Sequence, residues 1–141
     1  MTITVMVFYT RRPEVTPEDF QSHIEQVHLP IYLEVFSGNR PLSFTIRYTE
    51  RVSSGTGDRL GAVTSMTGRA DPEDPVVLIG EPKELGWDAV SEMIFRDELH
   101  IQQCLAVMNG SGGERIKEDE DMFAILDKTK AIIMTEKSVL M

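Results

Sequence analysis

Alternating apolar and polar positions predict four β-strands along this chain, over residues 3–9, 43–50, 87–95 and 128–136. The first stretch, residues 3–9, is apolar on nearly both faces, which is typical of a central strand that is covered on each side. The second and third stretches alternate regularly, as half-buried strands do. The pattern therefore predicts a sheet with residues 3–9 in its interior.

The segment between the first two predicted strands has the apolar spacing of a helix. Thr16 can cap the helix, Pro17 suits the first helical position, and the two acidic residues that follow favour the positive end of the helix dipole. Pro30 disfavours helical angles at the residue before it, so the regular helix is expected to end near His28. Apolar residues recur at steps of four, three and four, and they form one stripe: Phe20, Ile24, Val27 and Ile31.

A second helical pattern follows the third strand and ends at the glycine-rich residues 109–113. His100 lies beside the apolar stripe of this helix, so its side chain is expected to face solvent. The charged residues 114–121 are interpreted as a solvated helix face around Ile116. The stripe of the second helix comprises Ile101, Cys104, Leu105 and Met108.

The order of these elements is β-α-β-β-α-β, which matches the ferredoxin-like arrangement of four antiparallel strands with helices on one face. At 141 residues the chain is expected to form a single α+β domain over residues 1–141. Residues 51–85 interrupt the pattern as a long loop insertion. Such a connection is either a lid over a functional site or partly disordered, and the sequence leaves both alternatives open.

Charge and composition narrow the class of protein. The net charge of -9 argues against nucleic acid or an anionic membrane as a partner, because both bind basic surfaces. No apolar run approaches the ~20 residues of a membrane span, and no signal-peptide pattern opens the chain. A single cysteine, Cys104, allows no internal disulfide. Together these features favour a cytoplasmic protein.

A short motif runs through the first helix and consists of Arg12, Pro13, Thr16, Glu18, Phe20, Glu25, His28 and Pro30. It resembles the signature of the EthD family within the dimeric α+β barrel superfamily, in which a capped helix ends in His-x-Pro. Residues 88–95 also resemble the third strand of EthD-like proteins. The resemblance implies a homodimer in which two sheets pack face to face as a barrel, whereas composition only permits it.

His28 is the best single candidate for chemistry. The helical wheel places it at one edge of the apolar stripe and His23 at the other, so no shared metal site is expected. The end of the helix would raise the pKa of His28, and burial would lower it. If burial prevails, His28 is neutral at pH 7 and can act as a general base. In the alternative interpretation it only stabilises the helix dipole.

Aromatic residues on or near the strands are expected to complete an apolar pocket. Tyr9 and Tyr48 are the predicted catalytic partners of His28, because their O–H groups can bind a phenol or ketone. Trp87 can equally be a packing residue, and Glu92 either faces solvent or pairs with a buried histidine. No dinucleotide fingerprint or phosphate loop is present, so no cofactor is expected. The remaining expected substrate-binding residues are His23, Phe8, Tyr32 and Phe95.

The resemblance implies a cofactor-independent lyase or cyclase that acts on a small aromatic or polyketide-like metabolite. EthD-like proteins encoded beside secondary-metabolite genes are associated with decarboxylation, dehydration and cyclisation. In this hypothesis His28 moves a proton next to a carbonyl group, and Tyr9 or Tyr48 stabilises the enolate or phenolate oxygen. Two alternatives stay open: a cofactor-free monooxygenase of aromatic polyketides, and a non-catalytic dimeric protein that binds a hydrophobic metabolite.

Overall fold

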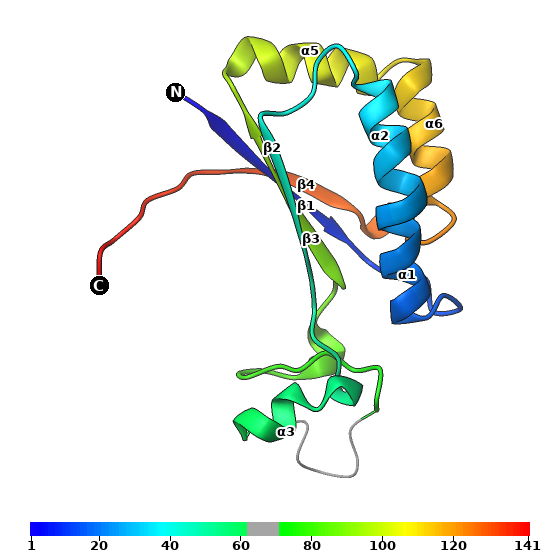
Figure 1. The fold of residues 1–141 in the computed structure, drawn as a ribbon, viewed down its shortest axis with the longest axis vertical. Coiled ribbons are helices and arrows are strands. Elements are labelled where there is room, and N and C mark those ends of the chain that lie inside the picture. The colour runs from blue at the N-terminus through cyan, green and yellow to red at the C-terminus, as the bar shows by residue number, and fades with distance from the viewer. Residues whose placement is uncertain (62–70) are drawn as a thin grey trace.

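The structure is a computed structural model and describes residues 1–61 and 71–141. Four strands form one antiparallel sheet in the order β2-β3-β1-β4 (Figure 1). The predicted α+β class and the ferredoxin-like order are confirmed, with β1 in the interior of the sheet. The strands are β1 (Ile3–Tyr9), β2 (Ser43–Tyr48), β3 (Ala89–Phe95) and β4 (Lys130–Met134), the last three each shorter than predicted.

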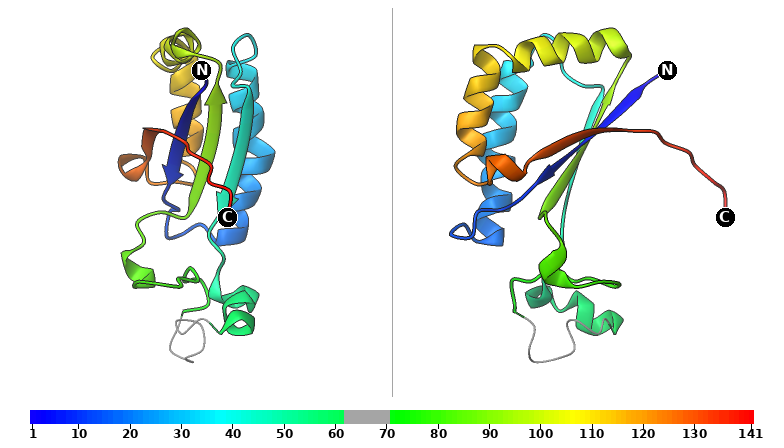
Figure 2. Two further views of the ribbon diagram at one scale, coloured as in Figure 1. Left: turned by 90° about the vertical axis from the view of Figure 1, so that its left-hand side faces the viewer. Right: turned by 180° about the vertical axis from the view of Figure 1, so that it is seen from behind.

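Two helical segments cover one face of this sheet, and its other face carries no helix (Figures 1 and 2). The first segment comprises α1 (Pro17–His23), the π-helix η1 (Ile24–His28) and α2 (Leu29–Val35). The second comprises α5 (Glu98–Met108) and α6 (Ser111–Glu120). Gly113 allows α5 and α6 to meet closely, since an added Cβ would lie 1.7 Å from the Met108 carbonyl oxygen.

The first helical segment does not end near His28, as the sequence predicted, but continues through Pro30 to Val35. Leu29 keeps helical angles, and its N–H donates to the Ile24 carbonyl five residues earlier. A proline within a helix lacks an N–H and clashes with the carbonyl group four residues before it. The wider π turn just before Pro30 accommodates both effects, so the helix is not interrupted.

The π turn also changes which residues of the first helical segment are buried. Phe20 and Ile24 lie in the core as predicted, but Val27 is 42% exposed. His28 is 5% exposed and takes the inward position instead. A π turn holds one residue more than an α turn, so it rotates the following side chains about the helix axis. The predicted stripe is therefore correct at Phe20, at Ile24 and at Ile31, which packs against the core, and wrong at Val27 within the π turn.

The described parts of residues 51–85 form short elements beyond one end of the sheet (Figure 1). Arg51 pairs with Pro75 in an isolated bridge, and its Nη2 lies 2.8 Å from Asp88 Oδ1. Residues 62–70 lie outside the described residues, so the question of lid or disorder stays open. The short elements are η2 (Val52–Ser54), α3 (Thr56–Leu60) and η3 (Pro82–Glu84).

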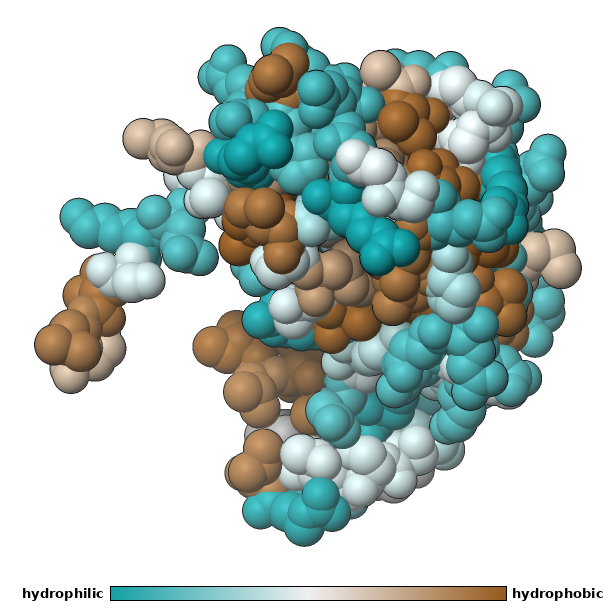
Figure 3. All heavy atoms as spheres, turned by 45° about the horizontal axis from the view of Figure 1, so that its top comes forward, coloured by the Kyte–Doolittle hydropathy of each residue, from teal (hydrophilic) through white to brown (hydrophobic). Residues whose placement is uncertain are grey.

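The C-terminal residues leave the body of the molecule after β4. Residues 135–141 extend away from the sheet (Figure 2), and the end of this arm is apolar (Figure 3). Leu140 and Met141 are fully exposed there. Among the described residues, no helix has both the length and the apolar character needed to cross a membrane.

Candidate active site

A cavity of about 350 Å³ lies between the helix-covered face of the sheet and helices α2, α5 and α6. Its volume is within the range of small-molecule sites, at the lower end. Seven of its lining residues carry oxygen or nitrogen groups on their side chains: Tyr9, His28, Tyr32, Asn109, Lys117, Glu120 and Thr129. The apolar wall includes Val5, Val7, Phe36, Phe95, Ile101, Met108 and Ile116.

His28 and His23 bind the same carboxylate. His28 Nδ1 lies 2.8 Å from Asp119 Oδ2, and His23 Nε2 lies 3.0 Å from Asp119 Oδ1. The prediction that the two rings point to opposite edges is therefore wrong, because one π turn separates them and places them on the same side. Across the described part of the chain, no three His, Cys, Asp or Glu side chains are grouped so that they could hold a metal ion.

Burial determines the protonation of His28. Its pKa is lowered by burial, and the hydrogen bond and charge of Asp119 oppose this effect. Because an ionised carboxylate only accepts hydrogen bonds, His28 donates from Nδ1 and its lone pair is on Nε2. No described residue forms a hydrogen bond with Nε2, and the ring lines the cavity. His28 is not at the end of its helical segment, so the dipole interpretation does not apply.

Two tyrosines bring hydroxyl groups to the same cavity. Tyr9 is 8% exposed, and its ring centroid lies 6.4 Å from that of His28. Burial, followed by the charge of Glu120, raises the pKa of Tyr9 well above its ordinary value, so the hydroxyl stays protonated at neutral pH. The Tyr32 hydroxyl donates a hydrogen bond to Met93 Sδ at 3.0 Å. A thioether sulfur is a weak acceptor, so a ligand oxygen can replace it.

Sequence reasoning missed two consecutive acidic residues on α6, Asp119 and Glu120. The segment was interpreted as a solvated face, yet Asp119 binds both histidines and Glu120 is 8% exposed. Thr129 Oγ1 donates to Glu120 Oε2 at 2.8 Å, and burial raises the pKa of Glu120. One signal was present in the sequence: they lie three and four residues after the buried Ile116, which places them near its side of the helix.

Four of the expected substrate-binding residues do not line this cavity: His23, Phe8, Trp87 and Glu92. Phe8 packs edge-on against Trp87, with ring centroids 5.3 Å apart. Phe8 and Glu92 lie at positions of β1 and β3 that alternate with the cavity-lining ones, so they belong to the face without helices. Glu92 Oε2 lies 4.0 Å from Arg47 Nη1, not beside a histidine. Of the other expected residues, Tyr32 and Phe95 do line the cavity.

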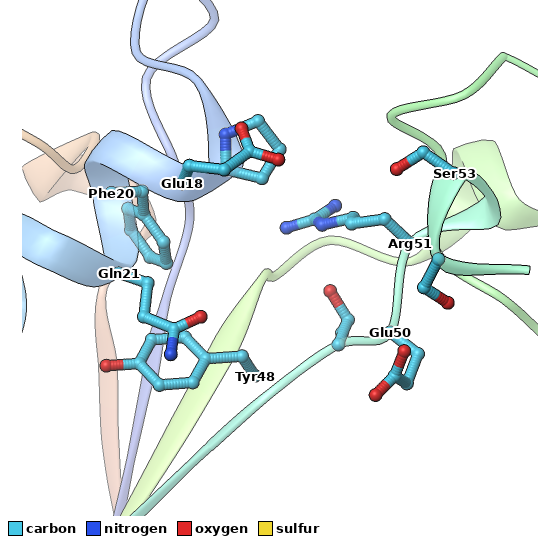
Figure 4. A pocket seen from close by; sticks show the side chains of 10 residues that line it. Glu18, Phe20, Gln21, Tyr48, Glu50, Arg51 and Ser53 are labelled. Atoms are coloured by element: carbon cyan, nitrogen blue, oxygen red, sulfur yellow. The ribbon is translucent and has the colours of Figure 1, made fainter. Parts of the chain in front are cut away.

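Tyr48 lines a different hollow, which is larger, about 540 Å³, and more open. Figure 4 shows it between Glu18 and Gln21 of α1 and the chain that follows β2, with Arg51 pointing into it. The structure therefore does not bring Tyr48 together with His28. His100 was expected in solvent but is 2% exposed, because its Nδ1 accepts a hydrogen bond from the Arg96 N–H.

A model of the EthD domain matches residues 12–127. The chain belongs to the EthD family. The resemblance found in the helix motif is therefore confirmed over most of the chain. A comparison with curated proteins finds no match.

Comparison with solved structures finds similar chains at low sequence identity, and the first two below share the fold. An EthD family protein of Bacillus halodurans C-125 is 17% identical, with a TM-score of 0.54 over 97% of this chain and 100% of the other. The At3g17210 protein of Arabidopsis thaliana is 11% identical, with a TM-score of 0.55 over 99% of each chain. SnoaB, a cofactor-independent oxygenase of Streptomyces nogalater, is 9% identical, with a TM-score of 0.49 over 99% of this chain and 96% of the other.

Proposed function

We propose that this EthD-family protein is a cofactor-independent lyase or cyclase that transfers a proton next to a carbonyl group of a small aromatic or polyketide-like metabolite. One observation carries the proposal. His28 is fixed through Nδ1 by Asp119, and its other nitrogen is available in the wall of an apolar cavity. General base catalysis by such a group contributes about 10²–10⁴-fold to a rate.

The residues present supply both parts of an enolisation. His28 Nε2 takes the proton from the carbon next to the carbonyl group, and Asp119 stabilises the imidazolium that forms. Tyr9 donates a hydrogen bond to the oxygen on which negative charge develops, since its raised pKa keeps the hydroxyl protonated. Tyr32 and Phe95 offer flat rings to an aromatic substrate.

The face of the sheet that carries no helix supports the homodimer in this proposal. In the strand register, Phe8 of β1 and Val90 of β3 are paired neighbours on it, and Met6 lies two residues before Phe8. Ile132 and Met134 of β4 continue this apolar surface and are 42% and 46% exposed. A second copy that packs its own sheet here would bury these side chains.

Hydrogen exchange tests the proposal without knowledge of the natural reaction. Small aryl alkyl ketones are first screened for binding, and those that bind are incubated with the protein in D₂O. Deuterium incorporation next to the carbonyl group is followed by NMR. We expect the native protein to accelerate exchange equally with and without oxygen, and H28N to lose the acceleration.

The other outcomes separate the alternatives. Ketones that bind without faster exchange would indicate a binding protein, and the enzyme proposal would be wrong. Product formation that requires oxygen would favour the monooxygenase. Acceleration that survives in H28N would exclude His28 as the base.

A further inference from the structure

Glu120 is a buried carboxyl group that enolisation by His28 does not require. It is the last residue of α6, and it lines the same cavity as His28. Its Oε2 is fixed by the hydrogen bond from Thr129, whereas no described residue forms a hydrogen bond with Oε1. One carboxyl oxygen is therefore held in place, and the other is available to a molecule in the cavity.

The groups around Glu120 favour its neutral form. The hydroxyls of Tyr9 from β1 and Tyr32 from α2 are uncharged, and His28 from η1 is a neutral imidazole. Lys117 is the only cationic residue among those that line the cavity, and it is exposed. A carboxyl group in apolar surroundings without a buried cation retains its proton to higher pH, and the pKa of Glu120 is raised accordingly.

We propose that Glu120 is a second catalytic residue, a neutral acid that protonates a second oxygen of the substrate, a leaving hydroxyl or an attacked carbonyl group, while His28 removes a proton from carbon. The inference rests on the function proposed above for His28. It assigns the two proton transfers to two elements: the π turn carries the base, and the end of α6 carries the acid. Thr129 is then a positioning residue, which holds the carboxyl group through Oε2.

The atoms balance for loss of water from a β-hydroxyketone. The C–H bond next to the carbonyl group breaks, and its proton moves to His28 Nε2. The C–O bond to the hydroxyl group breaks as that oxygen takes the proton of Glu120 and leaves as water, and a C=C bond forms. His28 is then protonated and Glu120 ionised. His28 loses its proton to solvent and Glu120 takes one up, which restores both groups.

The same arrangement selects a class of substrate. A decarboxylase substrate would bring its own carboxylate into the cavity, close to Glu120 and without a buried cation to pair with it. Burial of an unpaired charge is strongly unfavourable. A neutral hydroxyketone or polyketone avoids this cost, and it offers the oxygen that Glu120 can protonate. We therefore expect dehydration or aldol cyclisation rather than decarboxylation.

The variant E120Q separates the two proton transfers. Glutamine keeps the size of the side chain and an acceptor for Thr129, but it has no acidic proton to give. With a small aryl β-hydroxyketone in D₂O, deuterium exchange reports on His28, and ultraviolet absorption of the enone reports on water loss. We expect E120Q to lower water loss about 10²–10⁴-fold and to leave exchange near the native rate. The exposed neighbour provides the control E118Q, which should change neither.

Each result decides a different point. Water loss at the native rate in E120Q would overturn the inference. A native protein that exchanges hydrogen but eliminates no water would overturn it as well. In either case His28 would still be the base of the exchange reaction. A native protein that does neither would overturn the proposed function as well. Loss of both activities in a folded E120Q would show that Glu120 only maintains the cavity. The rate of water loss should fall on both sides of a pH optimum, and the alkaline fall should disappear in E120Q.

Discussion

The two hollows of this molecule differ more in chemistry than in size. The open hollow beside Tyr48 is the larger, about 540 Å³ against about 350 Å³. Its two carboxylates, Glu18 and Glu50, are exposed (Figure 4). In the smaller cavity His28 and Glu120 are both buried, and the pKa of each is shifted towards the neutral form. Titratable groups removed from water mark a catalytic site better than volume does.

Arg51 shows why the open hollow is structural. Its guanidinium binds Asp88 at 2.8 Å and the Glu73 carbonyl oxygen at 3.2 Å, so it fastens the inserted segment to the start of β3. The backbone N–H of Arg11 donates to the other oxygen of Asp88 at 2.7 Å. The charges of Arg51 and Asp88 are therefore engaged in holding loops together, whereas no described residue forms a hydrogen bond with Nε2 of His28.

The largest expected effect is the loss of activity in H28N. Asparagine can still reach Asp119 but cannot act as a base at neutral pH. We expect turnover in the deuterium-exchange assay to fall about 10²–10⁴-fold. Y48F in the open hollow is the matched control, since it removes a hydroxyl without changing the ring. Activity that is lost in Y48F and kept in H28N would show that the open hollow, and not the cavity of His28, is the active site.

A second prediction concerns Asp119, which binds His23 and also His28 in the wall of the smaller cavity. D119N removes the charge from the acceptor of two hydrogen bonds, each of which contributes about 1.5–3 kcal/mol. We therefore expect the free energy of unfolding to fall by at least the contribution of one such bond. Urea denaturation measures the loss. D121N is the control, because Asp121 is 54% exposed and its ion pair with Arg12 should contribute only about 0–1 kcal/mol. Equal losses in the two variants would contradict the buried role of Asp119.

The strands could be predicted from the sequence because their period is local. Alternation located β1 to the residue, and along β3 it separates the buried Ala89, Ser91 and Phe95 from the half-buried Glu92 and Ile94. Thr16 was recognised as a cap for the same reason, and its Oγ1 accepts from the Asp19 N–H at 3.1 Å. Features that depend only on residues close together in the sequence can be predicted without knowledge of the tertiary packing.

The site could be predicted only in part, because it depends on packing between distant segments. His28 was found, but its burial and its partner result from the π turn and from α6, which lies about ninety residues later along the chain. Asp119 and Glu120 sit within a charged run, and composition alone suggests that such a run faces solvent. Their spacing from Ile116 places both near the buried side of the helix, and the contact between the two helical segments shows which groups they bind there.

Narrowing the cavity gives a third, smaller effect. Ala131 of β4 lines the cavity but is itself exposed, so a larger side chain there can enter the cavity without overpacking the core. We expect A131F to weaken binding of an aryl ketone about tenfold, which corresponds to ~1.4 kcal/mol. S53F is the equivalent change in the open hollow and should leave the affinity unchanged. Isothermal titration calorimetry measures the affinity of both variants. Weaker binding in S53F alone would show that the ligand binds in the open hollow beside Tyr48 and not in the cavity of His28.

The smallest effect is the pH dependence of stability, because the two buried groups act in opposite directions. The pKa of His28 is lowered in the folded state, so the unfolded chain binds more protons and stability falls as pH drops below the unfolded value of about 6.5. The pKa of Glu120 is raised, so the folded chain binds more protons and stability falls as pH rises above the unfolded value of about 4.3. H28N should therefore lose the part of the decline that begins below about pH 6.5, and E120Q the part that begins above about pH 4.3. Unfolding free energies measured against pH would contradict this if both variants kept the native profile.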